Sequence, residues 1–186
     1  VGLTTQPKFL GLAVFLSLNV AVSAIVARRR GAGDRESANR VLRTALLATV
    51  ALTLVVSLAF VAFAGPIIRM VGSKPDTHPY AVEYLQIIMG GLGFSTVSLA
   101  LNAAQRGAGN TRIAMVTNII SNGVNVVFNY LLIGGNFGFP ALGVRGAALA
   151  TVIGTVCACA LSLASVLKKD GFLNLRSVKG WLADRA

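Results

Sequence analysis

The sequence predicts an all-α integral membrane protein with five transmembrane helices, and three observations lead to this fold class. The chain is 55% hydrophobic and only 12% charged, whereas soluble domains carry about 25% charged residues. Five apolar segments contain no Asp, Glu, Lys or Arg, and each approaches the roughly 20 residues that a helix needs to cross a bilayer. The charged residues lie in the connections around these segments.

The predicted spans follow one another closely along the chain. They cover residues 9–27, 44–64, 84–104, 113–133 and 146–167. The third span carries a cluster of glycines, Gly90, Gly91 and Gly93, at which a helix can bend or be approached closely.

The basic residues predict the orientation of the chain. Thirteen of the 17 lie in the first and third connections or after the last span, and the other four lie on the opposite side. The positive-inside rule places the side with thirteen in the cytoplasm. A net charge of +11 on a soluble face would suggest nucleic acid. Here the charges flank apolar spans, so we expect the lipid bilayer as partner and no nucleic acid.

This topology leads to an expectation about completeness. The chain begins at Val1, on the predicted outer side, without a signal sequence. We therefore expect a helix that precedes this sequence, which would give six spans with both ends in the cytoplasm.

Two of the predicted cytoplasmic turns repeat a short motif. Arg30-Gly-Ala-Gly-Asp34 and Arg106-Gly-Ala-Gly-Asn110 each follow one span and lead into the next. Gly suits the residue that ends a helix, and Asp or Asn suits the cap of the following helix. Neither motif continues with the Lys-Ser/Thr of a phosphate-binding P-loop, so we interpret both as similar helix-connecting turns.

The fourth span carries the strongest functional signal. Asn118, Asn122, Asn125 and Asn129 recur at steps of four, three and four, which places their amides on one helical stripe. Uncharged amides in an apolar helix are costly unless they face other helices or a water-filled cavity. The pattern therefore favours a polar seam inside a helical bundle, with packing as the alternative interpretation.

The third and fifth spans carry related stripes. Ser95, Ser98 and Asn102 share one face of the third span, and we predict that they line a cavity. In the fifth span, small residues form a ridge for close helix packing and Thr151 belongs to an adjacent hydroxyl stripe. Interhelical hydrogen bonding alone would also explain these hydroxyls, at about 0.6 kcal/mol per contact.

The composition argues against an enzyme or a metal centre. The chain has one His, no acidic residue within a span and no Gly-x-Ser-x-Gly. An intramembrane hydrolase would need paired acids or a metal site. We therefore expect no catalytic residues, no metal and no cofactor.

A succession of motifs resembles a known transporter family. Ala27-Arg-Arg-Arg-Gly-Ala-Gly-Asp34, Gln105-Arg-Gly-Ala-Gly-Asn-Thr111, Asn125-x-x-x-Asn129 and Gly143-x-x-Gly-Ala-Ala-x-Ala-Thr151 follow in this order. Together they resemble the multidrug and toxic compound extrusion (MATE) family of efflux transporters, of the DNA-damage-inducible type. The resemblance extends to about Gly171.

The resemblance implies an architecture and a site. Family members have twelve spans in two six-helix halves around a central cavity. Residues 1–171 would then be helices two to six of the N-terminal half, and residues 172–186 a cytoplasmic connector to the second half. The family's cation site joins an Asp on helix one, an Asn and an Asp on helix five and a Thr on helix six. The Asn and the Thr match Asn125 and Thr151, and this sequence departs from the pattern with Asn129 at the helix-five Asp.

The function implied is secondary active multidrug efflux at the bacterial inner membrane, by antiport of cationic or amphipathic compounds against Na⁺ or H⁺. Asn125, Asn129 and Thr151 would bind or relay the coupling ion, and Asn118 and Asn122 would extend the seam. Two alternatives remain: a lipid-linked precursor flippase of the same superfamily, and a membrane scaffold protein without transport activity. Flippases usually carry cationic residues in the cavity, and the five spans contain none.

Overall fold

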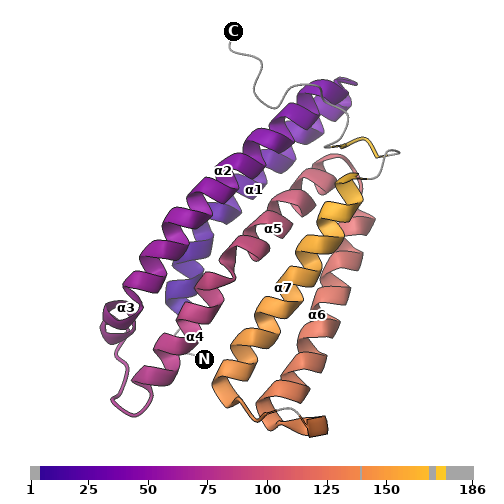
Figure 1. Ribbon diagram of the computed structural model, residues 1–186. Helices are drawn as coiled ribbons and strands as arrows, with labels where there is room; N and C mark the ends of the chain where they lie inside the picture. The colour runs from indigo at the N-terminus through magenta and orange to yellow at the C-terminus, as the bar shows by residue number, and fades with distance from the viewer. Residues whose placement is uncertain (1–4, 139, 168–170, 175–186) are drawn as a thin grey trace.

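The computed structural model describes residues 5–138, 140–167 and 171–174, and in these residues every regular element is a helix (Figure 1). The six longer helices run roughly along one common direction, and α5 lies between the α1–α2 pair and the α6–α7 pair. The predicted all-α class is therefore confirmed.

The first two helices form a long hairpin. Helix α1 spans Thr5–Gly31 and α2 spans Arg35–Ala62. Asp34 caps α2 because its carboxylate accepts the amide N–H of Ser37 at 3.0 Å. Hydrogen bonds from Ser37 are the main reason that the pKa of Asp34 lies below its ordinary value, and the positive charges of the nearby arginines lower it further.

Two of the predicted spans differ in shape from the expectation. The span expected at 44–64 breaks at Phe63, and a short helix α3, Ala64–Met70, follows it. The span expected at 84–104 is divided into α4, His78–Gly90, and α5, Leu92–Gly107, with a bend of 45° between them. The third predicted span is therefore a bent pair of helices, and the break lies at the glycine cluster where the sequence allows a helix to bend.

Packing explains the position of this break. A Cβ atom on Gly91 would lie 2.6 Å from the Cγ2 atom of Val152 on the last helix. Only glycine lets the bent backbone approach that helix so closely, and glycine also weakens the continuous helix by about 1 kcal/mol. The bend therefore lies where the chain has both a close neighbour and a poor helix former.

The last two helices form a second hairpin. Helix α6 spans Thr111–Gly134 and α7 spans Gly143–Leu167, which extends both predicted spans by a few residues. Gly135 ends α6 in the left-handed conformation, with φ of 68°. The short 3₁₀ turn η2, Asn136–Gly138, follows.

Three helices, α2, α6 and α7, are long and apolar enough to cross a membrane by length and composition, and the bent α4–α5 pair makes a fourth if it counts as one span. The predicted span at 9–27 is helical as part of α1, but the described part of α1 does not meet the same test. Two apolar clusters hold the bundle together. One joins α1, α3, α4, the start of α5 and α7, and the other joins α1, α2, α5, the end of α7 and Leu173.

The end of the described chain packs back onto the bundle. Leu173 is buried, and Arg35 on α2 donates a hydrogen bond from Nε to the carbonyl of Phe172 at 2.9 Å. The backbone N–H of Asn174 donates to Oδ1 of Asn39 at 2.8 Å. The first residues of the predicted connector are thus attached to the start of α2, and the rest of the connector, 175–186, lies outside the described residues.

Candidate functional site

The three predicted cation-site residues form one hydrogen-bonded chain between α6 and α7. Asn129 Nδ2 donates to Asn125 Oδ1 at 3.0 Å, and Asn125 Nδ2 donates to Thr151 Oγ1 at 3.3 Å. The Thr151 hydroxyl in turn donates to the carbonyl of Ala147 at 2.9 Å. The structure therefore brings Asn125, Asn129 and Thr151 together, and their role in binding or relaying the coupling ion stays a prediction.

The close approach of α6 and α7 makes this arrangement possible. A Cβ atom on Gly154 would lie 2.9 Å from the carbonyl oxygen of Ser121 and 3.3 Å from the Cβ atom of Asn125. Ser121 Oγ also donates to the carbonyl of Gly154 at 2.8 Å. The small ridge of α7 thus faces α6, with Gly146, Ala150, Gly154 and Ala158 all buried.

One oxygen at the end of this chain of amides has no protein partner. Asn129 Oδ1 is buried and accepts no hydrogen bond among the described residues. An unpaired polar atom in an apolar bundle costs about 1–3 kcal/mol unless something outside the helix pair satisfies it. This series of hydrogen bonds therefore ends at Asn129 Oδ1, an acceptor that could receive a cation, a proton donor or water.

The other two asparagines of the stripe do not join the chain of hydrogen bonds. Asn118 and Asn122 are exposed, whereas Asn125 and Asn129 are half-buried. A helix turns about 100° per residue, so the buried stripe of α6 that includes Thr117 lies next to the asparagine stripe and not on it. Asn118 and Asn122 lie outside the α6–α7 contact, and their role in lining a cavity stays a prediction.

Ser98 and Asn102 are buried in the interface between α5 and α7. Ser98 Oγ lies 3.3 Å from Ser162 Oγ, and Ser162 donates to Asn102 Oδ1 at 3.0 Å. Below them, Gln105 Nε2 donates to Ser165 Oγ at 3.0 Å. In this part of the chain the two residues act as interhelical links, so the structure gives them a packing role in place of the predicted exposure to an open cavity.

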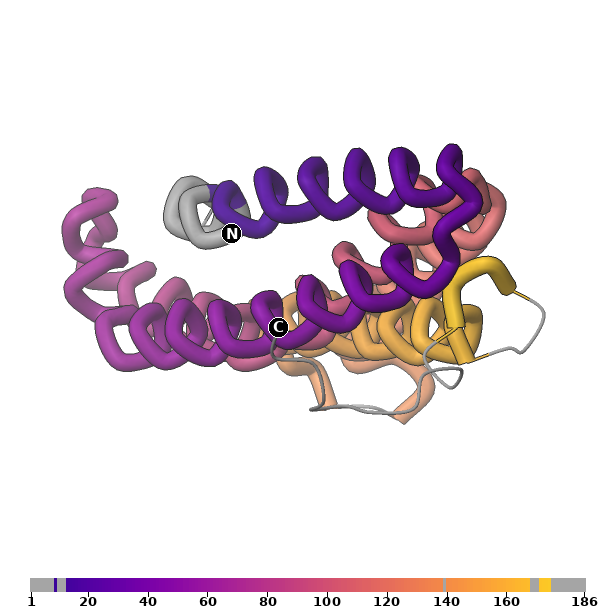
Figure 2. The backbone as a smooth tube through the Cα atoms, turned by 90° about the horizontal axis from the view of Figure 1, so that it is seen from above, coloured from indigo at the N-terminus to yellow at the C-terminus, as the bar shows by residue number. Residues whose placement is uncertain are grey.

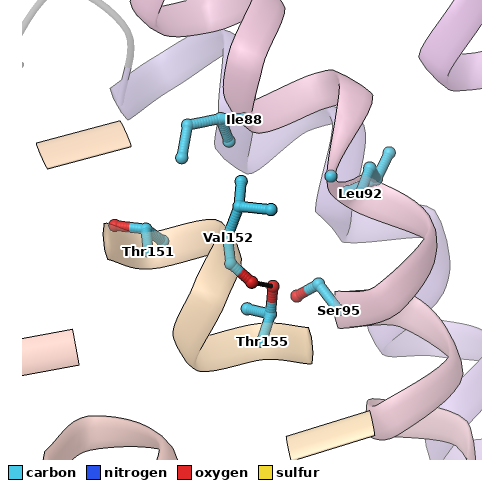
Figure 3. A pocket seen from close by; sticks show the side chains of 7 residues that line it. Ile88, Leu92, Ser95, Thr151, Val152 and Thr155 are labelled. Atoms are coloured by element: carbon cyan, nitrogen blue, oxygen red, sulfur yellow. Dashed lines mark hydrogen bonds between the residues drawn. The ribbon is translucent and has the colours of Figure 1, made fainter. Parts of the chain in front are cut away.

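Ser95 lines a small pocket of about 70 Å³ beside the break between α4 and α5 (Figure 3). The pocket lies against α7, where Val152 and Thr155 form its opposite wall. Figure 3 shows the Ser95 hydroxyl pointing toward Thr155, whose Oγ1 donates to the carbonyl of Val152 at 2.8 Å. Thr151 turns its hydroxyl away from this pocket, which is consistent with its bond to Asn125.

Sequence reasoning missed two of the polar partners. Ser121 donates to the Gly154 carbonyl between α6 and α7, and Ser165 accepts a hydrogen bond from Gln105 between α5 and α7. Ser121 lies four residues before Asn125 on the same face of α6, so helical spacing alone could have included it.

The donor set limits the chemistry of the site. Amide and hydroxyl oxygens are hard, neutral ligands that suit Na⁺ and carry no charge of their own. Within the described ranges, no group of three or more His, Cys, Asp or Glu could hold a metal ion. The arrangement could therefore orient a monovalent cation, and a carboxylate from elsewhere would supply the neutralising charge.

Comparison with known proteins assigns the chain to a family. The family description MatE matches residues 1–131. The chain is 29% identical over 174 residues to the probable multidrug resistance protein NorM of Thermotoga maritima, which covers 92% of this chain and 37% of that protein. A crystal structure of MATE in the bent conformation has a TM-score of 0.86 at 28% identity, and it covers 97% of this chain and 40% of that chain.

An inward-facing conformation of a multidrug resistance MATE family transporter has a TM-score of 0.85 at 27% identity and covers 94% of this chain and 39% of that one. The chain thus spans about 37–40% of the length of these relatives. The DNA-damage-inducible subtype stays a prediction. MATE proteins are multi-pass membrane transporters and not enzymes, and this chain belongs to the MATE family.

Proposed function

We propose that this chain forms part of a secondary active multidrug transporter, which exports cationic or amphipathic compounds in exchange for Na⁺ or H⁺. Family membership supports the efflux part of this proposal, and so do the names of the relatives, which are multidrug resistance proteins and transporters. The hydrogen bonds between α6 and α7 in this chain indicate where the coupling ion would act.

The single observation that carries the ion proposal is the directed chain of hydrogen bonds between α6 and α7. The hydrogen bonds run in one direction, from Asn129 to Asn125 and then to Thr151. None of these donors is directed at Asn129 Oδ1, so that oxygen remains available as an acceptor. A cation bound there would gain a hard oxygen ligand and would satisfy a buried polar atom at the same time. Three neutral ligands bind weakly, so a carboxylate outside the described residues would complete the site.

The test removes the two ligands separately in the protein expressed from its complete gene. Asn125→Leu and Thr151→Val should each depress ion-driven efflux of a fluorescent cation in membrane vesicles, at near-normal expression. Thr44→Val is a matched control, because Thr44 is exposed on α2 and far along the chain from the site. If both site variants retained full efflux and an unchanged ion dependence, the asparagines of α6 and Thr151 would serve only in helix packing, and the ion site would lie elsewhere.

A further variant restores the carboxylate that the family pattern has on helix five, where this sequence has Asn129. Asn129→Asp would place a carboxylate oxygen where an unpaired amide oxygen now lies. A charged ligand holds Na⁺ or a proton far better than an amide, so we expect the ion concentration for half-maximal efflux to fall. An unchanged ion dependence would argue that position 129 does not contact the ion.

The two alternatives predict different cargo. A lipid-linked precursor flippase would move a pyrophosphate-linked lipid and would not lower drug accumulation, and a scaffold protein would move neither. Accumulation of a fluorescent cation in efflux-deficient cells that express the complete gene separates all three. Wild-type protein should reduce accumulation, and dissipation of the ion gradient should abolish the effect.

The predicted partners are a preceding helix and a second six-helix half. The length of the relatives is consistent with a transporter larger than this chain. Expressed alone, residues 1–186 should therefore not transport. Ion-driven uptake by vesicles that contain only this chain would contradict that expectation.

We also place the protein in the bacterial inner membrane, with the turn between α1 and α2 in the cytoplasm. Cysteines substituted for Ser37 and Ser73 test this orientation. A membrane-impermeant thiol reagent applied from outside should label position 73 and not position 37, and the reverse labelling would invert the topology.

A further inference from the structure

The two repeated turns adopt the same conformation and lie next to each other. In the first, Gly33 N–H donates to the carbonyl of Arg30 at 3.0 Å, and in the second Gly109 N–H donates to the carbonyl of Arg106 at 2.9 Å. Both glycines have a positive φ, 71° and 73°. Arg30 Nη1 also donates to the carbonyl of Ala108, so the α1–α2 turn is bonded to the α5–α6 turn.

Figure 2 shows this proximity from above, with the end of α1 beside the turn that joins α5 to α6. The contact is close, because a Cβ atom on Gly107 would clash with the carbonyl oxygen of Ser23 on α1. The two turns therefore form one surface at one end of the bundle.

This surface is strongly basic, and its cations are all arginines. Residues 28–43 and 105–112 contain eight Arg, no Lys and two acids. The positive-inside rule is satisfied equally by Lys and Arg, so it does not explain the choice of Arg. A guanidinium presents a planar fork of donors that matches two phosphate oxygens, whereas an ammonium is a point charge.

Some of these arginines are occupied within the protein and some are available. Arg30 and Arg35 donate to backbone carbonyls, and Arg29 lies 3.8 Å from Asp34. Within the ranges that the structure describes, the side chains of Arg28, Arg106 and Arg112 form no hydrogen bond or ion pair, and all three residues are exposed.

Two of these unpaired arginines lie next to exposed apolar residues on the same helix. On α6, Arg112 is followed at helical spacing by Met115, Val116 and Ile119, which are 56%, 41% and 62% exposed. On α1, Ile25 lies three residues before Arg28 and is 44% exposed. Arg28 and Arg112 thus each lie at the end of an exposed apolar strip, the arrangement that suits a polar headgroup with acyl chains below it.

We propose that the two turns together form a binding surface for the phosphate headgroup of an anionic phospholipid. Arg28, Arg106 and Arg112 would hold the phosphate, and the exposed faces of α1 and α6 would contact the acyl chains. Basic surfaces at the cytoplasmic ends of transmembrane helices attract anionic headgroups by roughly fivefold per arginine. Binding of the lipid would stabilise the contact between the α1–α2 and α5–α6 turns, because one headgroup would bridge both.

The test uses the purified protein from its complete gene, in detergent at 0.15 M salt, with phosphatidylglycerol and phosphatidylcholine as probes. Native mass spectrometry counts the lipid that each variant retains. Wild-type protein should retain phosphatidylglycerol in preference to phosphatidylcholine. The triple variant R28Q/R106Q/R112Q should bind phosphatidylglycerol roughly 100-fold more weakly, from three arginines at the fivefold effect of each.

Two controls distinguish specific binding by these arginines from non-specific electrostatic attraction. The triple variant R28K/R106K/R112K keeps the charge but loses the fork geometry, and we expect an affinity at least about threefold below wild type. The double variant R69Q/K74Q removes two charges from the other end of the bundle and should bind as wild type. The guanidinium groups of these three arginines make no hydrogen bond or ion pair within the described residues, so the variants should unfold at the wild-type temperature.

Three results would overturn the proposal. The first is equal retention of phosphatidylglycerol by the R28Q/R106Q/R112Q variant and the wild type. The second is full affinity in the lysine variant, which would reduce the effect to diffuse charge. The third is complete displacement of the lipid by 10-fold excess inorganic phosphate, which would identify a free-phosphate site.

Discussion

The tightest contact between α6 and α7 yields a quantitative prediction for Gly146→Ala. A Cβ atom at Gly146 would lie 2.5 Å from the carbonyl oxygen of Leu132 and 2.7 Å from its carbonyl carbon, whereas ordinary van der Waals contact begins at 3.4 Å. The difference between 3.4 and 2.5 Å means that the helices would have to separate by about 0.9 Å at this point. Both neighbouring atoms belong to the backbone, so no side-chain rotation relieves the clash.

The magnitude follows from two opposing effects. Overpacking of this kind costs about 1–3 kcal/mol, and the better helix propensity of Ala returns at most about 1 kcal/mol. We expect a net loss of about 1–2 kcal/mol. Gly123→Ala is the matched control, because Gly123 is also helical, on α6, and has no atom within 4 Å of its added Cβ. It should be neutral or gain up to about 1 kcal/mol.

The assay is thermal unfolding in detergent, followed with a thiol-reactive dye. Cys157 and Cys159 lie half-buried on α7 and become reactive when α7 leaves the bundle. Gly146→Ala should lower the apparent Tm by roughly 2–8 °C, at about 2–4 °C per kcal/mol for a protein of this size. If Gly146→Ala were as stable as Gly123→Ala, the close α6–α7 packing would be refuted.

Three further predictions concern bonds elsewhere in the bundle. Thr96→Val removes the buried 2.8 Å hydrogen bond to Thr53 and should lower stability by about 0.6 kcal/mol, measured as a small fall in Tm; no change would show that the pair adds nothing. Arg145→Gln releases Glu83, which it pairs with across α4 and α7, so hydrogen exchange at the start of α7 should increase at low salt and converge with wild type at 1 M salt. Asp34 has a depressed pKa, so its stabilising effect is present above its ordinary pKa and is lost as pH falls through the folded-state value; the Tm difference between wild type and Asp34→Ala should therefore shrink below about pH 4, and a constant difference would contradict the linkage.

The helical class and the approximate spans could be predicted from composition and periodicity alone. Uncharged runs of membrane length leave the backbone no alternative to a helix in lipid, so α6 and α7 lie within a few residues of the expected limits. The repeated Gly-Ala-Gly turns were also predictable, because a positive φ at the final glycine is a local property. Local chemistry decides these features, and the sequence contains all of it.

The site was predicted in part, and the division has a physical reason. Spacing placed four asparagines on one stripe, and the structure brings Asn125 and Asn129 into contact with Thr151 while Asn118 and Asn122 remain exposed. Which edge of that stripe meets α7 depends on the rotation of α6 about its own axis, and packing against Gly154 sets that rotation.

The sequence by itself determined the helical class, the approximate positions of the spans and the polar stripes, because these depend on residues within one or two helical turns. Only the tertiary structure decided the 45° bend at Gly91, the contact between the two turns and the burial of Ser98 and Asn102 against α7. Each of these depends on the distance between helices far apart in sequence. That distance is set by where glycine lets two backbones meet, as at Gly146 and Leu132, and periodicity within one helix carries no information about its neighbour.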